Sequence, residues 1–432
     1  MRMEIGELRM IPITICDGKR ELAVFEALKA REGEVDAKVT ADVQAILADV
    51  KARGDEAVRE YSLKFDKAEP AEVDIAEQAQ RCAPEVLQAM RRAAENIRAF
   101  HERQKQQSWY VNKEHGVMLG QQIRGLHRVG VYVPAGTAPL PSSVLMNVIP
   151  AKIAGVKEII MVTPPWQGGV DPSIAAAAQI AGVDRMFLVG SAWACAALAY
   201  GTEMIPRVDK IVGPGRIHVA IAKKLLYGTV DIDMIAGPSE ILVVADETAN
   251  PAWLAADLLS QAEHDVLAGV VLLSTSQNIA ERTVAELERQ LDELPRKDIA
   301  IEALRNNTAI LVCESMEQAI ALANAYAPEH LELCIANPME RLGEIENAGS
   351  IFLGHYTPES VGDYYAGPNH VLPTGGTPRF FSPLSVDDFV KKMQFVHYTR
   401  PALEAARDDI VTIAEAEFLQ AHANAAKIRF EV

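Results

Sequence analysis

Residues 232–264 read IDMIAGPSEILVVADETANPAWLAADLLSQAEH, and the rest of the chain is interpreted around this stretch. Its turn at 236–239 combines a glycine, which tolerates positive φ, with a proline, which restricts φ. The β-branched run Glu240–Ala245 has the length and composition of a buried strand. Asn250 is a plausible N-cap for a helix over 252–263. The stretch therefore predicts a turn, a strand, a loop and a helix.

This helix ends in Gln261-Ala262-Glu263-His264. Gln261 and His264 are three residues apart, so a helix places them on one face. Such a pair can hold a metal or can simply form a polar helix end. Spacing alone favours the polar helix end, because polar pairs at this spacing are common.

The composition limits the class of protein. A chain of 432 residues is long enough for two or more domains, and 49% hydrophobic with 23% charged residues is typical of soluble globular proteins. The net charge of −17 argues against nucleic-acid and anionic-membrane partners. No apolar run is long enough to span a membrane. The five cysteines form no C-x-x-C motif, which favours free thiols and a reducing, cytoplasmic setting.

Strand-like and helix-like segments alternate from residue 128 onward. Strands are expected at 128–133, 158–163, 186–189, 210–212, 270–274, 309–312, 331–335 and 350–353, with helical segments between most of them. This alternation predicts right-handed βαβ units and mainly parallel sheets. The predicted class is therefore α/β, with two Rossmann-like βαβ half-domains, an N-terminal arm and a C-terminal helical extension.

The predicted boundaries follow this change of pattern. Residues 1–35 form the arm. Residues 36–128 and 241–378 form a discontinuous first α/β domain, and residues 129–240 form a second α/β domain on the cofactor side. Residues 379–432 form a helical tail for dimerisation. The amphipathic stretch at 40–65 is interrupted by Gly54, which predicts two helices or a kink.

Glu329 and His330 stand side by side between a helix and a strand. A carboxylate next to an imidazole favours the protonated ring and can supply a base near neutral pH. A structural histidine at a helix end is an equally good interpretation of the residues alone.

The segment 357–378 is rich in glycine and proline, and long loops inside compact domains are usually functional. Asp363 and His370 lie in it, too far apart for a local metal motif. Glu417 and His422, near the C-terminus, have an acid-x4-His spacing. On a continuous helix these two side chains would point in different directions.

Residues 232–264 resemble the signature segment of the histidinol dehydrogenase family, through the Ile-Asp start, the Ala-Gly-Pro-Ser-Glu turn and the closing Gln-Ala-Glu-His. The resemblance extends from about residue 40 to residue 427. It implies a zinc-dependent enzyme that oxidises L-histidinol to L-histidine through the aldehyde with two NAD⁺, the last step of histidine biosynthesis. It also implies a domain-swapped homodimer.

The resemblance assigns roles to individual residues. His330 would take the alcohol proton and Glu329 would activate water. One Zn²⁺ per subunit would be held by Gln261, His264, Asp363 and His422, a nitrogen and oxygen set that suits catalytic zinc. The substrate would contact the zinc set together with Ser239, His330, His370 and Glu417. In a swapped dimer, Glu417 and His422 would reach the site of the other subunit.

The cofactor side has weaker motifs. The dinucleotide fingerprint G-x-G-x-x-G is absent; the turn Gly213-Pro214-Gly215 opens a helix and could accept an anion, although a plain turn explains it as well. The resemblance places Tyr132, Trp193 and Arg216 at cofactor contacts. The family usually has Gln at the position of Trp193 and Asn at that of Arg216. The indole offers only one hydrogen-bond donor, and the arginine adds a permanent cation.

Two other functions remain open from the sequence. The chain could oxidise another small alcohol, such as sulfopropanediol, on the same scaffold. It could also be a zinc- or ligand-binding homologue whose cofactor site is impaired by the changes at Trp193 and Arg216. The complete zinc set together with Glu417 favours a substrate that carries an amine and an imidazole.

Overall fold

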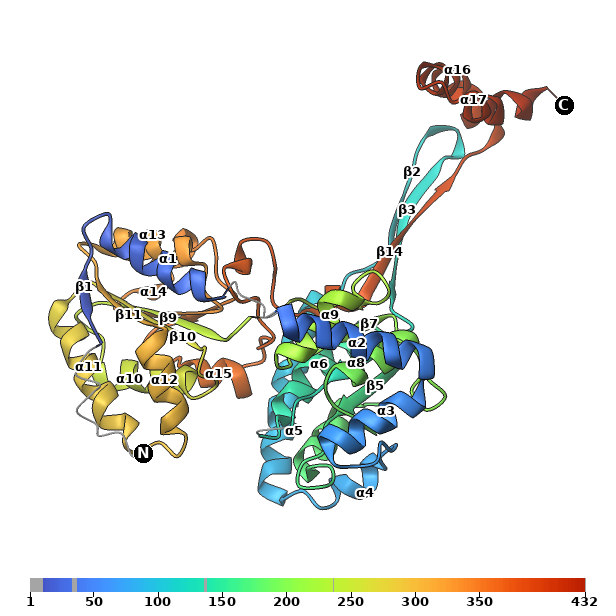
Figure 1. Cartoon of the computed structure of the whole chain (residues 1–432). Coiled ribbons are helices and arrows are strands. Elements are labelled where there is room, and N and C mark those ends of the chain that lie inside the picture. The colour runs from blue at the N-terminus through green and yellow to red at the C-terminus, as the bar shows by residue number, and fades with distance from the viewer. Residues whose placement is uncertain (1–10, 33–36, 136–137, 236, 432) are drawn as a thin grey trace.

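The computed structural model describes residues 11–32, 37–135, 138–235 and 237–431. It contains two α/β lobes and a long ribbon that projects away from them and carries the C-terminal helices (Figure 1). Both lobes are built on parallel sheets, so the predicted fold class is confirmed. No helix among these residues has both the length and the apolar character needed to cross a membrane.

The first lobe contains a six-stranded sheet in the order β1-β11-β10-β9-β12-β13, in which every pairing is parallel. Side chains of β9 alternate between two apolar cores, as expected for a strand covered on both faces. The strands are β1 (Ile13–Ile15), β9 (Glu240–Ala245), β10 (Gly269–Ser274), β11 (Thr308–Val312), β12 (His330–Cys334) and β13 (Ser350–Leu353). The helices are α1 (Arg20–Glu32), α10 (Pro251–Ala262), α11 (Gln277–Leu291), α12 (Lys297–Asn306), α13 (Met316–Tyr326) and α14 (Pro338–Arg341).

The second lobe contains a five-stranded parallel sheet in the order β6-β5-β4-β7-β8. Its strands are β4 (Arg128–Tyr132), β5 (Glu158–Thr163), β6 (Arg185–Leu188), β7 (Lys210–Val212) and β8 (Asp231–Ile232). Helices α6 (Pro141–Ile153) and α7 (Pro172–Ala181) cover one face, and α8 (Ser191–Tyr200) and α9 (Ile217–Leu226) cover the other. Apart from β1, both sheets share the doubly wound order, with switch points at β4/β7 and β9/β12.

The N-terminal helices pack on the five-stranded sheet. Val43, Leu47 and Val50 of α2 (Ala37–Arg53) share a core with α8, and α5 (Pro84–His101) shares one with α6 and α7. Between α2 and α3 (Asp55–Tyr61), Gly54 has φ 58°, so the predicted break is present. The short α4 (Ile75–Ala79) packs on α7.

This packing differs from the predicted grouping of residues 36–128 with 241–378. The apolar faces of α2 and α5 find their partners on the alanine-rich helices α7 and α8, which follow them in the chain. The N-terminal segment also differs from a separate arm. Strand β1 pairs with β11, and Phe25 packs in the core of the six-stranded sheet.

The ribbon is an antiparallel sheet in the order β14-β3-β2, formed by β2 (Trp109–Asn112), β3 (Met118–Gly125) and β14 (Val390–His397). It leads to α16 (Arg400–Ala416) and α17 (Gln420–Lys427). The prediction that residues 379–432 form a helical tail was therefore wrong for β14. This segment is a strand because β3, far away in the sequence, pairs with all eight of its residues.

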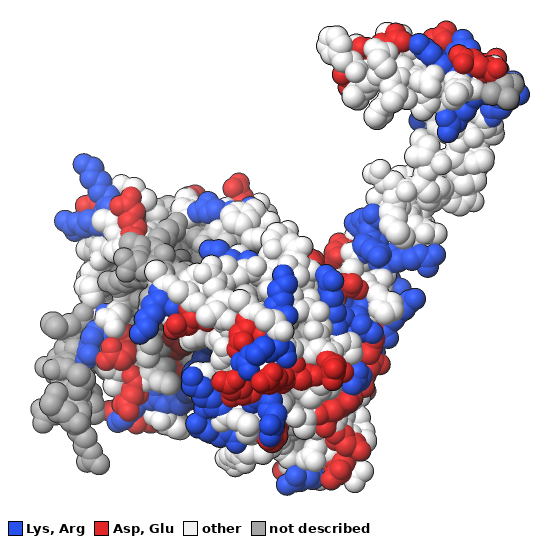
Figure 2. Space-filling model, turned by 45° about the vertical axis from the view of Figure 1, so that its right-hand side comes forward, with Lys and Arg blue, Asp and Glu red and all other residues white. Residues whose placement is uncertain are grey.

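The surface agrees with the mixed composition. On the face drawn in Figure 2, basic and acidic side chains are interspersed over the lobes, whereas the middle of the ribbon is mostly uncharged. All five cysteines are free thiols, and four of them are buried.

Candidate active site

The amino ends of β9 and β12 bring the first site residues together. These neighbouring strands run parallel, with His330 opposite Ile241. The backbone N–H of Glu240 donates to Oε2 of Glu329 at 2.8 Å, and the backbone oxygen of Glu240 lies 3.0 Å from Nδ1 of His330. Glu329 and His330 are both buried. A single residue of β9 thus contacts both predicted catalytic side chains through its backbone.

The contact with Glu240 fixes the tautomer of the neutral His330 ring. A carbonyl oxygen can only accept a hydrogen bond, so Nδ1 carries the proton and donates. In the neutral ring, Nε2 is then the basic atom. This Nε2 is buried and has no hydrogen-bond partner among the described residues. A buried polar atom without a partner is costly, which points to a group that binds in front of it.

The charges around His330 are unusual. Burial alone would lower the pKa of its imidazole, but the carboxylates of Glu329, Glu359 and Asp363 outweigh burial and raise this pKa to about 10. Nε2 lies 3.7 Å from Oδ1 of Asp363 and 3.9 Å from Oε1 of Glu359. Burial also raises the pKa of Glu329 to about 7, although the nearby His330 opposes that rise. The site has an excess of negative groups around one imidazole.

The C-terminal end of α10 forms one wall of this site. Gln261 is completely buried. With its amide oriented to satisfy both neighbours, it donates to Oε1 of Glu359 at 2.7 Å and accepts from the N–H of Glu240 at 3.0 Å. His264 follows at the helix end, as the spacing predicted. Gln261 therefore joins α10 to the other segments of the site.

The segment 357–378 was expected to be a loop, but it contains the short helix α15 (Glu359–Tyr364). Glu359 and Asp363 are four residues apart on it, so both carboxylates face His330. Burial, with the charges of Asp363 and Glu329, raises the pKa of Glu359 to about 8. Glu359 was not predicted from the sequence as a site residue. Its spacing from Asp363 was a usable signal, although Gly362 between them weakened the helical pattern.

The buried Glu332 and the half-buried Asp257 lie next to Glu359. Oε1 of Glu332 accepts from the N–H of Glu359 at 2.8 Å. Burial raises the pKa of Asp257 to about 6 and raises that of Glu332 well above its usual value. Asp257 and Glu332 can therefore share a proton between their carboxyl groups, which makes this pair a support for α15.

Three predicted metal ligands come together in the structure. Ligand atoms of His264, Glu359 and Asp363 all lie within 4.8 Å of one another, and Gln261 bonds to Glu359. Imidazole nitrogen and carboxylate oxygen are donors that zinc accepts, and a divalent cation would balance the excess negative charge. The residues present therefore fit a zinc ion, with Glu359 beside the predicted set.

Two predicted substrate residues also lie here. Nδ1 of His370 donates to the backbone oxygen of Asp363 at 3.0 Å, which fixes that ring next to α15. The hydroxyl of Ser239, immediately before β9, hydrogen-bonds the carboxylate of Glu329. His370 therefore adjoins Asp363, whose Oδ1 lies 3.7 Å from Nε2 of His330, and Ser239 adjoins Glu329, whose Oε2 lies 3.6 Å from Nδ1 of the same ring.

Glu417 and His422 do not reach this cluster within the chain. Both are exposed, and they lie at the outer end of the ribbon, away from both lobes (Figure 1). Helix α16 ends at Ala416 and Phe418 has φ 60°, so the two residues do not share a continuous helix as the sequence suggested. Within one chain, Glu417 and His422 are therefore not part of the cluster around His330.

The predicted cofactor residues lie at the carboxyl edge of the five-stranded sheet. Tyr132 ends β4, and its hydroxyl accepts from the N–H of Ser191 at 3.2 Å. The N–H of Gly213 donates to Oδ2 of Asp233 at 2.8 Å. This amide is therefore already occupied, and an anion at the 213–215 turn would need other donors.

Trp193 is integrated into the protein core. Its ring is buried and stacks with Tyr61 and Phe65, at centroid distances of 5.8 and 5.6 Å. Its Nε1 donates to the hydroxyl of Ser62 at 3.2 Å. Arg216, in contrast, is exposed as the N-cap of α9. Trp193 can form a wall of a cofactor site, whereas Arg216 is accessible to one.

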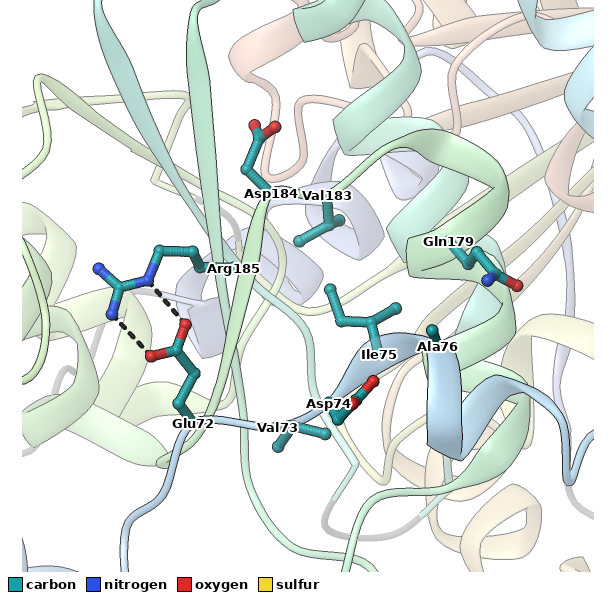
Figure 3. A pocket seen from close by; sticks show the side chains of 9 residues that line it. All are labelled: Glu72, Val73, Asp74, Ile75, Ala76, Gln179, Val183, Asp184 and Arg185. Atoms are coloured by element: carbon teal, nitrogen blue, oxygen red, sulfur yellow. Dashed lines mark hydrogen bonds and ion pairs between the residues drawn. The ribbon is translucent and has the colours of Figure 1, made fainter.

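A hollow of about 330 Å³ lies elsewhere, at the outer edge of the five-stranded sheet (Figure 3). Its charged side chains already have internal roles. Arg185 forms an ion pair with Glu72 at 2.7 Å, and Asp74 caps α4 by accepting from the N–H of Glu77. This hollow offers no free catalytic group.

Comparison with known proteins gives a consistent result. The profile of the histidinol dehydrogenase family matches residues 29–430. Histidinol dehydrogenases from Clostridium acetobutylicum and Bacillus cereus are each 52% identical, over 98% and 96% of this chain and 99% and 98% of their own lengths. The crystal structure of histidinol dehydrogenase from Elizabethkingia anophelis superposes with a TM-score of 0.89 at 40% identity, covering 97% of both chains.

Proposed function

The chain belongs to the histidinol dehydrogenase family and oxidises L-histidinol to L-histidine, and we propose that the cluster at the amino ends of β9 and β12 performs this reaction. The observation that carries the proposal is the buried Nε2 of His330, which faces carboxylate oxygens of Asp363 and Glu359 but has no hydrogen-bond partner among the described residues. The relatives that match nearly the whole chain have the same name, so oxidation of another alcohol and a purely ligand-binding role are not favoured.

His330 is the base for the alcohol in this proposal, and it acts from its neutral form, which requires a cation beside Glu359 and Asp363 to offset the carboxylates that otherwise raise its pKa to about 10. Its Nδ1–H bond to the Glu240 carbonyl holds the ring and leaves Nε2 directed at the substrate hydroxyl. The carboxylates of Glu359 and Asp363 stabilise the imidazolium that forms when the proton arrives. A nicotinamide cofactor, NAD in this proposal, supplies the hydride acceptor when it is bound.

Glu329 is the base for water. Because its pKa is about 7, a large fraction of its carboxylate is ionised at neutral pH and can take a proton from a water molecule that adds to the aldehyde. The bonds from Glu240 N–H and from the Ser239 hydroxyl orient this carboxylate. His330 would thus take the alcohol proton through Nε2 in the first oxidation. Glu329 would take the proton of water through its carboxylate before the second.

One Zn²⁺ per subunit would be held by Gln261, His264 and Asp363, together with His422 of a second subunit. When bound, the ion polarises and orients the substrate and lowers the charge imbalance around His330. Ser239, His370 and Glu417 would contact the substrate. The proximity of His264 to Asp363 and Glu359 supports this assignment.

The exposed ribbon supports a domain-swapped homodimer. Tyr110 and Val396 on it are 62% and 70% exposed, and Phe418 beyond it is 89% exposed. Apolar side chains exposed to this extent usually mark a protein–protein interface. A second copy would cover them and would receive His422 and Glu417.

The cofactor would bind at the carboxyl edge of the five-stranded sheet, where open α/β sheets bind ligands. Tyr132 and Trp193 would form its wall, and Arg216 would face a phosphate group. Stacking and the bond to Ser62 already hold Trp193 without cofactor.

The test is NADH formation from L-histidinol with zinc present. We expect steady turnover by the wild type and by Trp193→Gln/Arg216→Asn, and loss of turnover in His330→Asn. A wild type that is inactive while the double variant gains activity would show that the cofactor site is altered. Full activity of His330→Asn would contradict the proposed base.

A further inference from the structure

A buried ion pair lies beneath the 213–215 turn. Lys223 of α9 and Asp233, just after β8, form an ion pair with side chains only 5% and 1% exposed. Burying two charges is expensive unless their remaining hydrogen-bonding groups are also satisfied. The other hydrogen bonds of Lys223 and Asp233 therefore indicate the role of the pair.

Both members of the pair bond to the backbone of the same residue. Nζ of Lys223 donates to the carbonyl of Gly213 at 2.9 Å, and Oδ2 of Asp233 accepts from the N–H of Gly213 at 2.8 Å. Oδ1 of Asp233 accepts from the N–H of Met234 at 2.6 Å. The pair therefore fixes both polar groups of one glycine at the end of β7.

Gly213 lies tightly against Tyr132. It has φ 111°, and a Cβ on it would stand 2.1 Å from the backbone oxygen of Tyr132. Tyr132 in turn accepts from the N–H of Ser191 at the start of α8. The ends of β4 and β7 and the start of α8 are thus joined at the switch point of this sheet, where a ligand is expected.

We propose that Lys223 and Asp233 are positioning residues for the dinucleotide, because they hold Gly213, and through it Tyr132, in the geometry that binds the cofactor. This inference rests on the proposed cofactor site. It predicts that the pair affects the KM for NAD⁺ and not only the stability of the lobe.

The same two strands provide a control pair, in which the lysine is buried and the acid is 51% exposed. Lys210 begins β7 and forms an ion pair with Asp231 of β8 at 3.0 Å, at the opposite, amino ends of the same two strands. Lys210 is also buried, and it donates to the backbone oxygen of Asp388. Loss of the Lys210–Asp231 ion pair should disturb the same sheet without moving Gly213.

The experiment compares Lys223→Met/Asp233→Asn with Lys210→Met/Asp231→Asn at saturating L-histidinol and zinc. Removing both charges avoids an unpaired buried ion. We expect the first variant to raise the KM for NAD⁺ by about tenfold with a smaller change in kcat, because loss of a binding contact that is equal in the ground and transition states weakens cofactor binding without slowing the chemical step. The control variant should keep the wild-type KM, even if its melting temperature falls. The single variant Lys223→Arg keeps the charge and the donor. Its KM for NAD⁺ should therefore stay closer to that of the wild type than to that of Lys223→Met/Asp233→Asn.

Two further readings complete the test. Lys223→Met alone removes the donor to the Gly213 carbonyl and leaves Asp233 with two backbone N–H donors, so it provides a second variant if the double substitution does not fold. An unchanged KM for NAD⁺ in either folded variant, or an equal rise in the control, overturns the inference. An inactive wild type would instead contradict the proposed cofactor site and remove the premise of this inference.

Discussion

Nδ1 of His330 lies 3.0 Å from the backbone oxygen of Glu240, so the tautomer of the proposed base is set by a group that no side-chain substitution removes. The same residue donates its N–H to Glu329. Strand β9 therefore sets the orientation of both proposed catalytic groups, and substitutions of those groups should affect chemistry more than folding.

His330→Asn should lower kcat for L-histidinol by about 10²- to 10⁴-fold, the usual contribution of a general base. An asparagine amide can still donate to the Glu240 carbonyl, so the melting temperature should change little. The measurement is NADH formation at saturating substrate. His127→Asn is the control, because His127 is exposed on the surface. A loss below tenfold in His330→Asn would exclude His330 as the base.

Oxidation of the aldehyde should depend on pH through Glu329. Burial raises the pKa of this carboxyl to about 7, and its ionised form is the base. The rate should therefore fall as the pH drops below about 7, where the carboxyl becomes protonated, and level off above it. The measurement is the pH–rate profile with the aldehyde supplied as the substrate. Glu329→Gln should remove the fall in rate at low pH from this profile. A profile with the same fall in Glu329→Gln would assign the fall to another group.

Subunit mixing should reveal a swapped site. Dimers that combine one His330→Asn chain with one His422→Ala chain contain one complete site, because the intact His330 faces the other chain's intact His422. We expect about half of wild-type activity per mixed dimer, and almost none from either parent.

The mixed dimers can be purified with two different tags after co-expression. Dimers of His330→Asn with Glu329→Gln are the control, since both changes lie on the same lobe and each site keeps one defect. Activity in His422→Ala alone at the wild-type level would contradict a shared site.

Zinc should stabilise the folded protein. An ion that binds only the folded state raises the free energy of unfolding by about 2.7 kcal/mol at a hundredfold excess over its Kd. The melting temperature rises with it. We expect a chelator to lower the melting temperature and added Zn²⁺ to restore it. His264→Asn and Asp363→Asn should lose this response. Glu263→Gln, next to His264 but outside the proposed ligand set, should retain it, and equal loss in that variant would contradict the assignment.

Trp193→Gln should cost about 3 kcal/mol of unfolding free energy, because it removes a buried indole that stacks against Tyr61 and Phe65 in a cluster of three rings. Urea unfolding without cofactor measures this cost. Trp253→Gln is the control, since that ring is 43% exposed and should contribute less. A smaller loss for Trp193→Gln than for Trp253→Gln would show that the indole does not contribute through packing.

Local patterns in the sequence predicted much of the fold. Buried parallel strands such as Glu240–Ala245 are continuous β-branched runs, and this signal does not depend on their partners. Strand β14 was missed because its apolar and charged residues become a strand only through pairing with β3, more than 260 residues earlier. The packing of α2 and α5 was assigned to the wrong sheet for a similar reason, since an amphipathic stripe does not identify its partner.

The site shows the same division. Gln261 with His264, and Glu329 with His330, are close in sequence and were visible as pairs. Asp363 required the family resemblance, because α15 lies about a hundred residues from α10. Glu359 was missed although it faces the same imidazole. Distances between segments depend on the fold, and a single sequence does not contain them.

The two sheets offer opposite edges to their sites. The cluster around His330 lies at the amino edge of one sheet, beside the C-terminus of α10, whereas Tyr132 and Arg216 lie at the carboxyl edge of the other, beside the N-termini of α8 and α9. Each helix has a macrodipole equivalent to about half a unit charge at either end, negative at the C-terminus. The backbone itself therefore favours a cation at the first edge and a phosphate at the second, before any side chain is considered.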